Sequence, residues 1–203
     1  DRSLGFARSV LAAQNHGIIV ICEKLVESAG GFNTDLVIFK TDHNGALLWS
    51  KILGNSDEDE RGRSIAAAND GGFIVAGQTA KQGNYAALFM KLDGMENLQW
   101  RSILQTGNYS MANSVTVAHD GFIFTGSAGR DVLVGKINLQ GDFIWIRRIN
   151  PKAKHGWGNS IIRLRNGKFA ITGSYGEGGG FGGGEYDTFL LIVDKNGNFE
   201  TRN

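Results

Sequence analysis

The chain has 203 residues, of which 41% are hydrophobic and 20% charged, with a formal net charge of +1. This balance of charge argues against a dedicated nucleic-acid or anionic-membrane binder, because such proteins need a net cationic field. The single cysteine, Cys22, excludes an internal disulfide and a cysteine-built metal site. No apolar run approaches the roughly 18 residues of a membrane-spanning helix, so no membrane span is predicted.

The sequence contains four copies of one pattern. Three copies end in the phrases KTDHNGALLW, KLDGMENLQW and KINLQGDFIW, and the fourth, IVDKNGNFET, has Thr201 where the others have tryptophan. The phrase recurs about every 45 to 50 residues, and repeats of this length built from short strands indicate β-propeller blades. We therefore predict one domain whose blades span approximately residues 1–54, 55–105, 106–149 and 150–203.

Each copy predicts four strands, A to D. Strand A holds a small residue, Arg or Asn, Ser, and then Val or Ile, which places the inner strands at Arg8–Ala13, Ser64–Ala68, Ser114–Val117 and Ser160–Leu164. Strands B and C are apolar at nearly every position, as expected where both faces of a sheet are covered. The predicted fold is all-β: a β-propeller of four blades of four antiparallel strands, closed by packing blade 1 on blade 4. The alternative is a four-blade arc that completes a larger ring by dimerisation.

The phrase Lys-x-Asp-x-x-Gly-x-x-x-Trp, together with DGGFIVAG from Asp70 to Gly77, resembles the repeat of bacterial β-propeller proteins that are typically exported or surface-associated. It is also distantly similar to the tryptophan-docking motif of quinoprotein propellers. This resemblance implies scaffold positions, with Trp49, Trp100 and Trp145 docking between blades. The cofactor-holding residues of quinoproteins are not found, so no cofactor is expected.

The two ends of the blades differ in how much the four copies vary. The A–B and C–D turns are short and nearly uniform, and we call their end of the molecule the turn face. The B–C and D–A connections are long and unlike one another, and we call their end the variable-loop face. Because loops that vary on a rigid scaffold commonly carry function, we expect any ligand at the variable-loop face.

Several side chains are candidates for ligand binding on that face. Equivalent inner-strand positions hold arginine in two copies and asparagine in two, which would suit a carboxylate or another anion. Aromatic side chains beside polar loops would suit stacking on a glycan or peptide. The candidate binding residues are Arg8, Arg61, Arg63, Tyr109, Asn113, His155, Trp157, Asn159 and Glu185.

No catalytic residue or metal site is assigned from the sequence. The run from Asp57 to Glu60 begins like a calcium loop but lacks the closing glutamate, and the four histidines lack metal-ligand spacing. The glycine tract Gly176–Gly184 has no phosphate-loop ending and is predicted to form a flap.

These features favour a non-enzymatic binding module of an exported bacterial protein. Its partner would be a glycan, a peptide or another protein, and its location secreted, periplasmic or on the cell surface; nucleic acid is not expected, and the chain is predicted to be a monomer. One alternative is a carbohydrate-active hydrolase or lyase that uses the carboxylates among Asp57–Glu60 and Glu185. The other alternative is a structural spacer.

Overall fold

The computed structural model describes residues 5–13, 17–28, 31–55, 57–150, 154–177 and 186–200. All regular secondary structure in these ranges is β-strand, arranged as four sheets of four antiparallel strands. The predicted all-β architecture of four four-stranded blades is therefore confirmed. No helix long and apolar enough to cross a membrane occurs in the described ranges.

The strands of each blade follow one another in space in sequence order. Blade 1 contains β1 (Phe6–Ala12), β2 (Ile18–Ser28), β3 (Gly31–Thr41) and β4 (Leu47–Leu53). Blade 2 contains β5 (Asp59–Ala67), β6 (Phe73–Lys81), β7 (Asn84–Leu92) and β8 (Leu98–Leu104). Blade 3 contains β9 (Ser110–Ala118), β10 (Gly121–Ala128), β11 (Asp131–Ile137) and β12 (Phe143–Ile149). Blade 4 contains β13 (His155–Arg163), β14 (Phe169–Gly176), β15 (Tyr186–Val193) and β16 (Phe199–Glu200).

The inner strands β1, β5, β9 and β13 begin earlier than predicted. In blade 2, for example, β5 starts at Asp59 rather than Ser64, so the acidic run lies partly in a strand. The reason is a β-bulge: the pairing of β5 with β6 shifts register between Gly62 and Ser64, which interrupts the sequence pattern without ending the strand. The same shift occurs in the other three blades.

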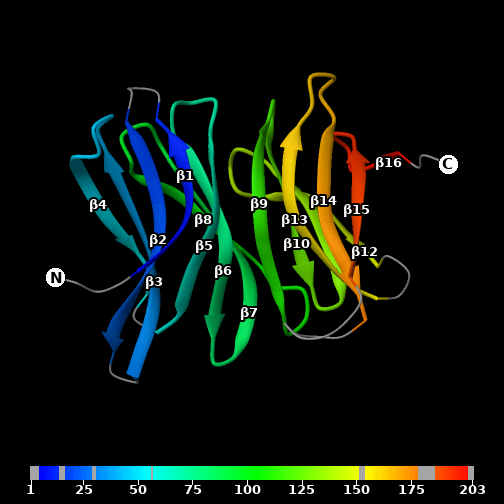
Figure 1. Cartoon of the computed structure of the whole chain (residues 1–203), viewed down its shortest axis with the longest axis horizontal. Coiled ribbons are helices and arrows are strands. Elements are labelled where there is room, and N and C mark those ends of the chain that lie inside the picture. The colour runs from blue at the N-terminus through cyan, green and yellow to red at the C-terminus, as the bar shows by residue number, and fades with distance from the viewer. Residues whose placement is uncertain are drawn as a thin grey trace.

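The four blades form an open arc, so the predicted closure of blade 1 on blade 4 is wrong. Figure 1 shows the sheets side by side, with the two termini at opposite ends of the arc. Three apolar cores fill the spaces between blades 1 and 2, blades 2 and 3, and blades 3 and 4. No core of described residues joins blade 4 to blade 1. The open arc of the alternative prediction is observed, whereas its completion by dimerisation stays a prediction.

The serine that recurs in every copy links neighbouring blades at two of the interfaces. The Ser64 Oγ accepts a hydrogen bond from the Val115 amide at 3.3 Å, and the Ser114 Oγ accepts one from the Ile161 amide at 3.2 Å. A group bound to the backbone of the next blade has a scaffold role.

All four C–D turns share one geometry. In each turn the first side chain, an Asp or Asn, accepts two backbone amide hydrogen bonds, and the fourth residue has a positive φ. That residue is Gly45, Gly141 or Gly197 in three copies, as left-handed backbone favours glycine. In blade 2 it is Glu96, with φ of 68°. The second copy therefore has a different residue in the same turn geometry.

The tryptophans dock onto the C–D turn of the following blade. Trp100 donates its indole N–H to the Leu139 carbonyl at 2.8 Å, and Trp145 donates to the Lys195 carbonyl at 3.0 Å. Both rings lie against the turn glycine, since a Cβ built on Gly141 would come within 2.9 Å of the Trp100 ring. The predicted equivalent positions between blades are therefore observed, although the rings are half-buried at the outer rim.

Candidate functional site

In the described part of the variable-loop face, the B–C connections of blades 2 and 3 are tight hairpins rather than long loops. In blades 2 and 3 the B–C connections are two residues long, Gln82–Gly83 and Gly129–Arg130. The strands extend into segments that we predicted to be loops, because Gln82 adopts a φ of 51° and completes a tight turn with Gly83. Side chains on this face therefore project from strand ends, which fix their positions.

Two of the predicted arginines lie on the inner strands and bind partners on the adjacent strand of their own blade. Arg8 donates two hydrogen bonds to the buried Glu23 carboxylate, at 2.9 and 3.0 Å. At the equivalent place in blade 2, Arg63 donates to Gln78 at 3.2 Å. Sequence reasoning missed Glu23 and Gln78, although their signal was available: each lies one residue after the small residue that ends the strand B pattern.

Arg8, Arg61, Arg63 and Tyr109 come close enough together to influence one another. Burial, and next the positive charge of Arg8, lowers the pKa of Arg63, while Tyr109 and Glu23 act in the opposite direction. The Nε atoms of Arg61 and Arg63 are buried without a hydrogen-bond partner among the described residues. The cluster therefore has guanidinium N–H groups without a hydrogen-bond partner, next to polar side chains on the strands.

The remaining predicted binding residues are not part of that cluster. Asn113 donates to the Gly158 carbonyl of blade 4 at 2.9 Å, which makes it a link between blades, and Asn159 is exposed. His155 and Trp157 stack on each other in blade 4, with centroids 6.0 Å apart. Glu185 and most of the predicted flap lie outside the described residues. The equivalent Arg and Asn side chains therefore have different partners: Arg8 and Arg63 bind within their own blades, and Asn113 binds the next blade.

A second cluster gathers carboxylates between blades 1 and 2 at the variable-loop end. The Arg101 Nη2 lies 2.7 Å from Glu58 Oε2 and 3.1 Å from Glu60 Oε1, so one guanidinium nitrogen bridges two carboxyl groups. The Asn55 amide also donates to Glu60, at 3.2 Å. Glu58 and Glu60 belong to the acidic run found in the sequence, but Arg101, which follows the docking tryptophan of blade 2, was missed.

The two glutamates differ in their affinity for protons. Burial raises the pKa of Glu60 to about 7, because its side chain is 0% exposed and the Asn55 amide and Arg101 offset only part of the desolvation. The hydrogen bond from Arg101 lowers the pKa of Glu58. At neutral pH this pair therefore holds one ionised carboxylate beside a carboxyl group that is about half protonated.

The raised pKa of Glu60 predicts a stability that falls as pH rises. Below the unfolded pKa of about 4.5 the carboxyl is neutral in both states. Between there and pH 7 the unfolded chain ionises first, which destabilises the fold by up to about 1.4 kcal/mol per pH unit. Urea unfolding at pH 5 and pH 7.5 should show this loss in the wild type and a flatter profile in Glu60→Gln. An unchanged slope in the variant would assign the pH dependence to other groups.

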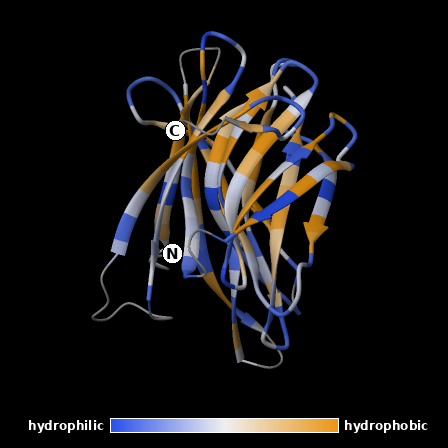
Figure 2. Ribbon diagram, turned by 90° about the vertical axis from the view of Figure 1, so that its right-hand side faces the viewer, coloured by the Kyte–Doolittle hydropathy of each residue, from blue (hydrophilic) through white to orange (hydrophobic). Residues whose placement is uncertain are grey.

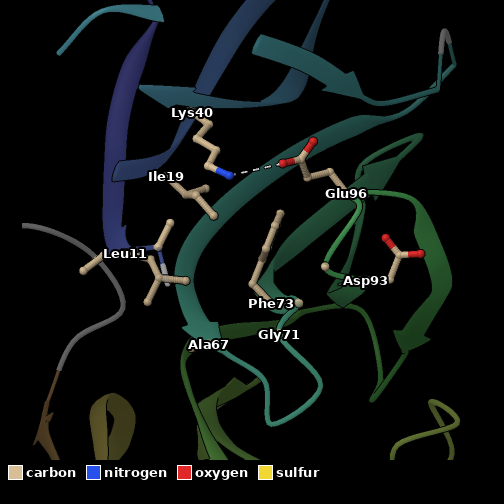
Figure 3. Close-up of a pocket in the computed structure, with 12 residues that line it drawn as sticks. Leu11, Ile19, Lys40, Ala67, Gly71, Phe73, Asp93 and Glu96 are labelled. Carbon is tan, nitrogen blue, oxygen red and sulfur yellow. Dashed lines mark hydrogen bonds and ion pairs between the residues drawn. The ribbon is translucent and has the colours of Figure 1, made fainter. Parts of the chain in front are cut away.

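A pocket of about 250 Å³ lies between blades 1 and 2 on the turn face (Figure 3). Leu11, Ile19 and Phe73 give it an apolar wall, and Lys40 reaches across it to Glu96 at 3.4 Å. The pocket is lined by the C–D turn that carries glutamate in place of glycine. The turn face was expected to be uniform, and this substitution makes it locally distinct.

No group of three or more His, Cys, Asp or Glu side chains in the described ranges is arranged to hold a metal ion. The acidic cluster does not form such a site, because its carboxylates are bound to Arg101 and to backbone amides. The described residues of the variable-loop face offer carboxyl groups, guanidinium groups and aromatic rings.

The sequence matches no protein-family model and no curated protein. The fold is similar to solved glycoside hydrolases. An α-L-arabinanase of Penicillium chrysogenum, complexed with arabinobiose, has a TM-score of 0.63 and 8% identity over 97% of this chain and 65% of its own. A glycosyl hydrolase of Bacteroides ovatus has a TM-score of 0.56 and 10% identity, over 98% and 69%. An α-L-arabinofuranosidase of Podospora anserina has the same TM-score and identity, over 98% and 68%.

These similarities establish the propeller fold, and this chain spans about two thirds of the length of the three proteins. They also overturn the preference for a non-enzymatic binding module. Arabinanase, xylosidase and arabinofuranosidase structures recur among the similar folds, so the carbohydrate-active alternative is the better supported of the two.

Proposed function

We propose that this protein is a carbohydrate-active enzyme of the glycoside hydrolase class, with Glu58 and Glu60 as its acid–base pair. The observation that carries the proposal is a pair of carboxyl groups that Arg101 bridges and whose pKa values differ. Burial raises the pKa of Glu60, whereas the hydrogen bond from Arg101 lowers the pKa of Glu58. Glycoside hydrolysis requires one carboxyl that stays protonated near neutral pH and one that is ionised. A shared guanidinium nitrogen also keeps the two carboxyl groups close together.

In this proposal Glu60 donates a proton to the leaving-group oxygen, and Glu58 acts as nucleophile or base. The Asn55 amide is hydrogen-bonded to Glu60, whose side chain is fully buried, so substrate can reach this carboxyl only if the residues that cover it move. The Arg63 and Arg61 donors, together with Tyr109, lie on the same face and would contact sugar hydroxyl or carboxylate groups. Solved structures with similar folds supply the substrates to test first: arabinan, arabinofuranosides, xylosides and β-1,2-mannosides.

The test is hydrolysis of chromogenic glycosides and polysaccharides of these types by the purified chain. We expect turnover that falls as pH rises above about 7, since Glu60 then loses its proton. Glu60→Gln and Glu58→Gln should each lower the rate by about 100-fold or more. Glu96→Gln is the matched control, because Glu96 is an ion-paired glutamate on the turn face. Absence of turnover across the panel, or equal rates in all variants, would rule out the proposal.

We further propose that the protein acts outside the cytoplasm. The support is the resemblance of its repeat to exported propeller proteins and the polymeric nature of the proposed substrates. Fractionation of the source cells with an antibody against the chain would test this location, and a purely cytoplasmic signal would contradict it.

A further inference from the structure

Because the four blades have equivalent positions, the exposure of a residue in one blade can be compared with that of its counterparts in the others. At one position of the inner strand, the four copies hold Val10, Ile65, Val115 and Ile161. The last three are 7%, 4% and 5% exposed, because the preceding blade covers them. Val10 is 64% exposed. The first copy thus keeps an apolar side chain at a place where its counterparts pack against a neighbour.

A second position on the same face gives the same result. Ile18 is 36% exposed, whereas its counterparts Phe73, Phe122 and Phe169 are 3%, 0% and 1% exposed. We call this surface of blade 1, defined by Val10, Ile18, Val20, Val37, Phe39 and Gly45, the leading face. Apolar residues in this arrangement match the buried faces of blades 2, 3 and 4, so the leading face has the composition of an interface.

The turn glycine of blade 1, Gly45, has no tryptophan ring packed against it. A Cβ on Gly141 or Gly197 would meet the docked tryptophan of the preceding blade at 2.9 or 3.0 Å, whereas a Cβ on Gly45 would meet nothing within 4 Å. The Gly45 turn has the same backbone and side-chain hydrogen bonds as the other turns. It therefore offers an indole-binding surface with no ring on it.

We propose that the leading face binds a further blade of this same repeat, one whose strand D carries the docking tryptophan and which precedes blade 1 in the same polypeptide. At each of the three observed interfaces, the covering blade is the one that immediately precedes in sequence. A second copy of this chain fits less well, because its terminal blade has Thr201 at the tryptophan position and would leave the Gly45 turn empty.

The opposite end of the arc, in blade 4, also exposes an apolar side chain that is buried in the other blades. Leu190 is 69% exposed, whereas its counterparts Ile38, Phe89 and Val134 are all 0% exposed. Figure 2 looks onto this end and shows hydrophobic stretches along the strands, with hydrophilic residues at the turns. An arc whose two end faces are both apolar is part of a larger ring rather than a complete one.

The test lengthens the chain at its N-terminus by a second copy of residues 106–149, which supplies a blade ending in tryptophan. We expect the melting temperature to rise by more than about 5 °C. Most of this gain should be lost when the added tryptophan is changed to alanine, because the indole then no longer reaches the Gly45 turn. No rise, or a rise independent of that tryptophan, would overturn the proposal.

Val10→Asp provides the matched measurement. In the 203-residue chain it should shift the melting temperature by no more than about 2 °C, because Val10 is exposed, whereas in the lengthened chain it should cost several degrees. Ile65→Asp should lower the melting temperature of both chains strongly. Light scattering should find the 203-residue chain monomeric. A dimer that Val10→Asp dissociates would show instead that a second copy covers the leading face.

Discussion

Replacing Trp100 by alanine should lower the free energy of unfolding by about 3 kcal/mol, at the lower end of the range for large aromatic side chains. The ring packs on the Gly141 turn and against Phe122, and its indole N–H bonds the Leu139 carbonyl. The alanine would lose all three contacts and leave a gap between blades 2 and 3. Urea unfolding followed by fluorescence and by circular dichroism would measure the loss.

Trp49→Ala is the internal comparison. Its indole N–H is buried without a hydrogen-bond partner among the described residues, and the turn that faces it carries Glu96 in place of glycine. Because no hydrogen bond is lost, we expect a smaller cost, about 2 kcal/mol. Equal costs for the two tryptophans, or a larger one for Trp49, would contradict the role assigned to the docking turn.

The repeat made most of the fold predictable. Four copies of one turn-and-tryptophan phrase predicted four blades, because each copy encodes its own turn chemistry and its own docking residue. Ring closure was not predictable in this way. The sequence pattern of blade 1 is the same whether or not a neighbour covers Val10, since exposure depends on what lies beside the blade.

The candidate site was predictable only in part. Sequence reasoning placed Arg8, Arg63, Glu58 and Glu60 at the variable-loop end, where the structure has them. It missed Glu23, although the position of Glu23 after the small residue of strand B was visible in the sequence. It could not find Arg101, because that contact joins different strands through side-chain reach. It also grouped Asn113 with the arginines, whereas the structure uses Asn113 to bind the next blade.

The strongest electrostatic prediction concerns Lys91, which is 1% exposed. Its ammonium group bonds the Asp70 carboxylate at 2.7 Å, the Leu92 carbonyl at 2.8 Å and the Gln99 side chain at 3.1 Å. Burial alone would raise the pKa of Asp70, but the hydrogen bonds from Lys91 and from the Gly72 amide hold it below its usual value. The pair therefore stabilises the fold above pH 4, and this contribution is lost as pH falls through the lowered pKa.

Asp70→Asn should cost about 2 to 3 kcal/mol at pH 7, because it leaves a buried ammonium without its counter-charge. Asparagine keeps the bond to the Gly72 amide, as Asn166 does with Lys168 in blade 4, so the change isolates the charge. Asp42→Asn is the control: Asp42 lies in an exposed turn whose counterpart in blade 3 is already asparagine, and we expect less than about 0.5 kcal/mol.

The fourth copy of the repeat indicates a second substitution that should restore the stability lost in Asp70→Asn. Blade 4 has Asn166 and Ile192 at the positions of Asp70 and Lys91, so it lacks both charges together. The double variant Asp70→Asn, Lys91→Ile should therefore return to within about 1 kcal/mol of the wild type, since an apolar pair can replace a buried ion pair at little cost. It should also lose the stability decrease below pH 4 that the wild type shows. A double variant as unstable as Asp70→Asn alone would mean that Lys91 contributes through its other two hydrogen bonds rather than through its charge.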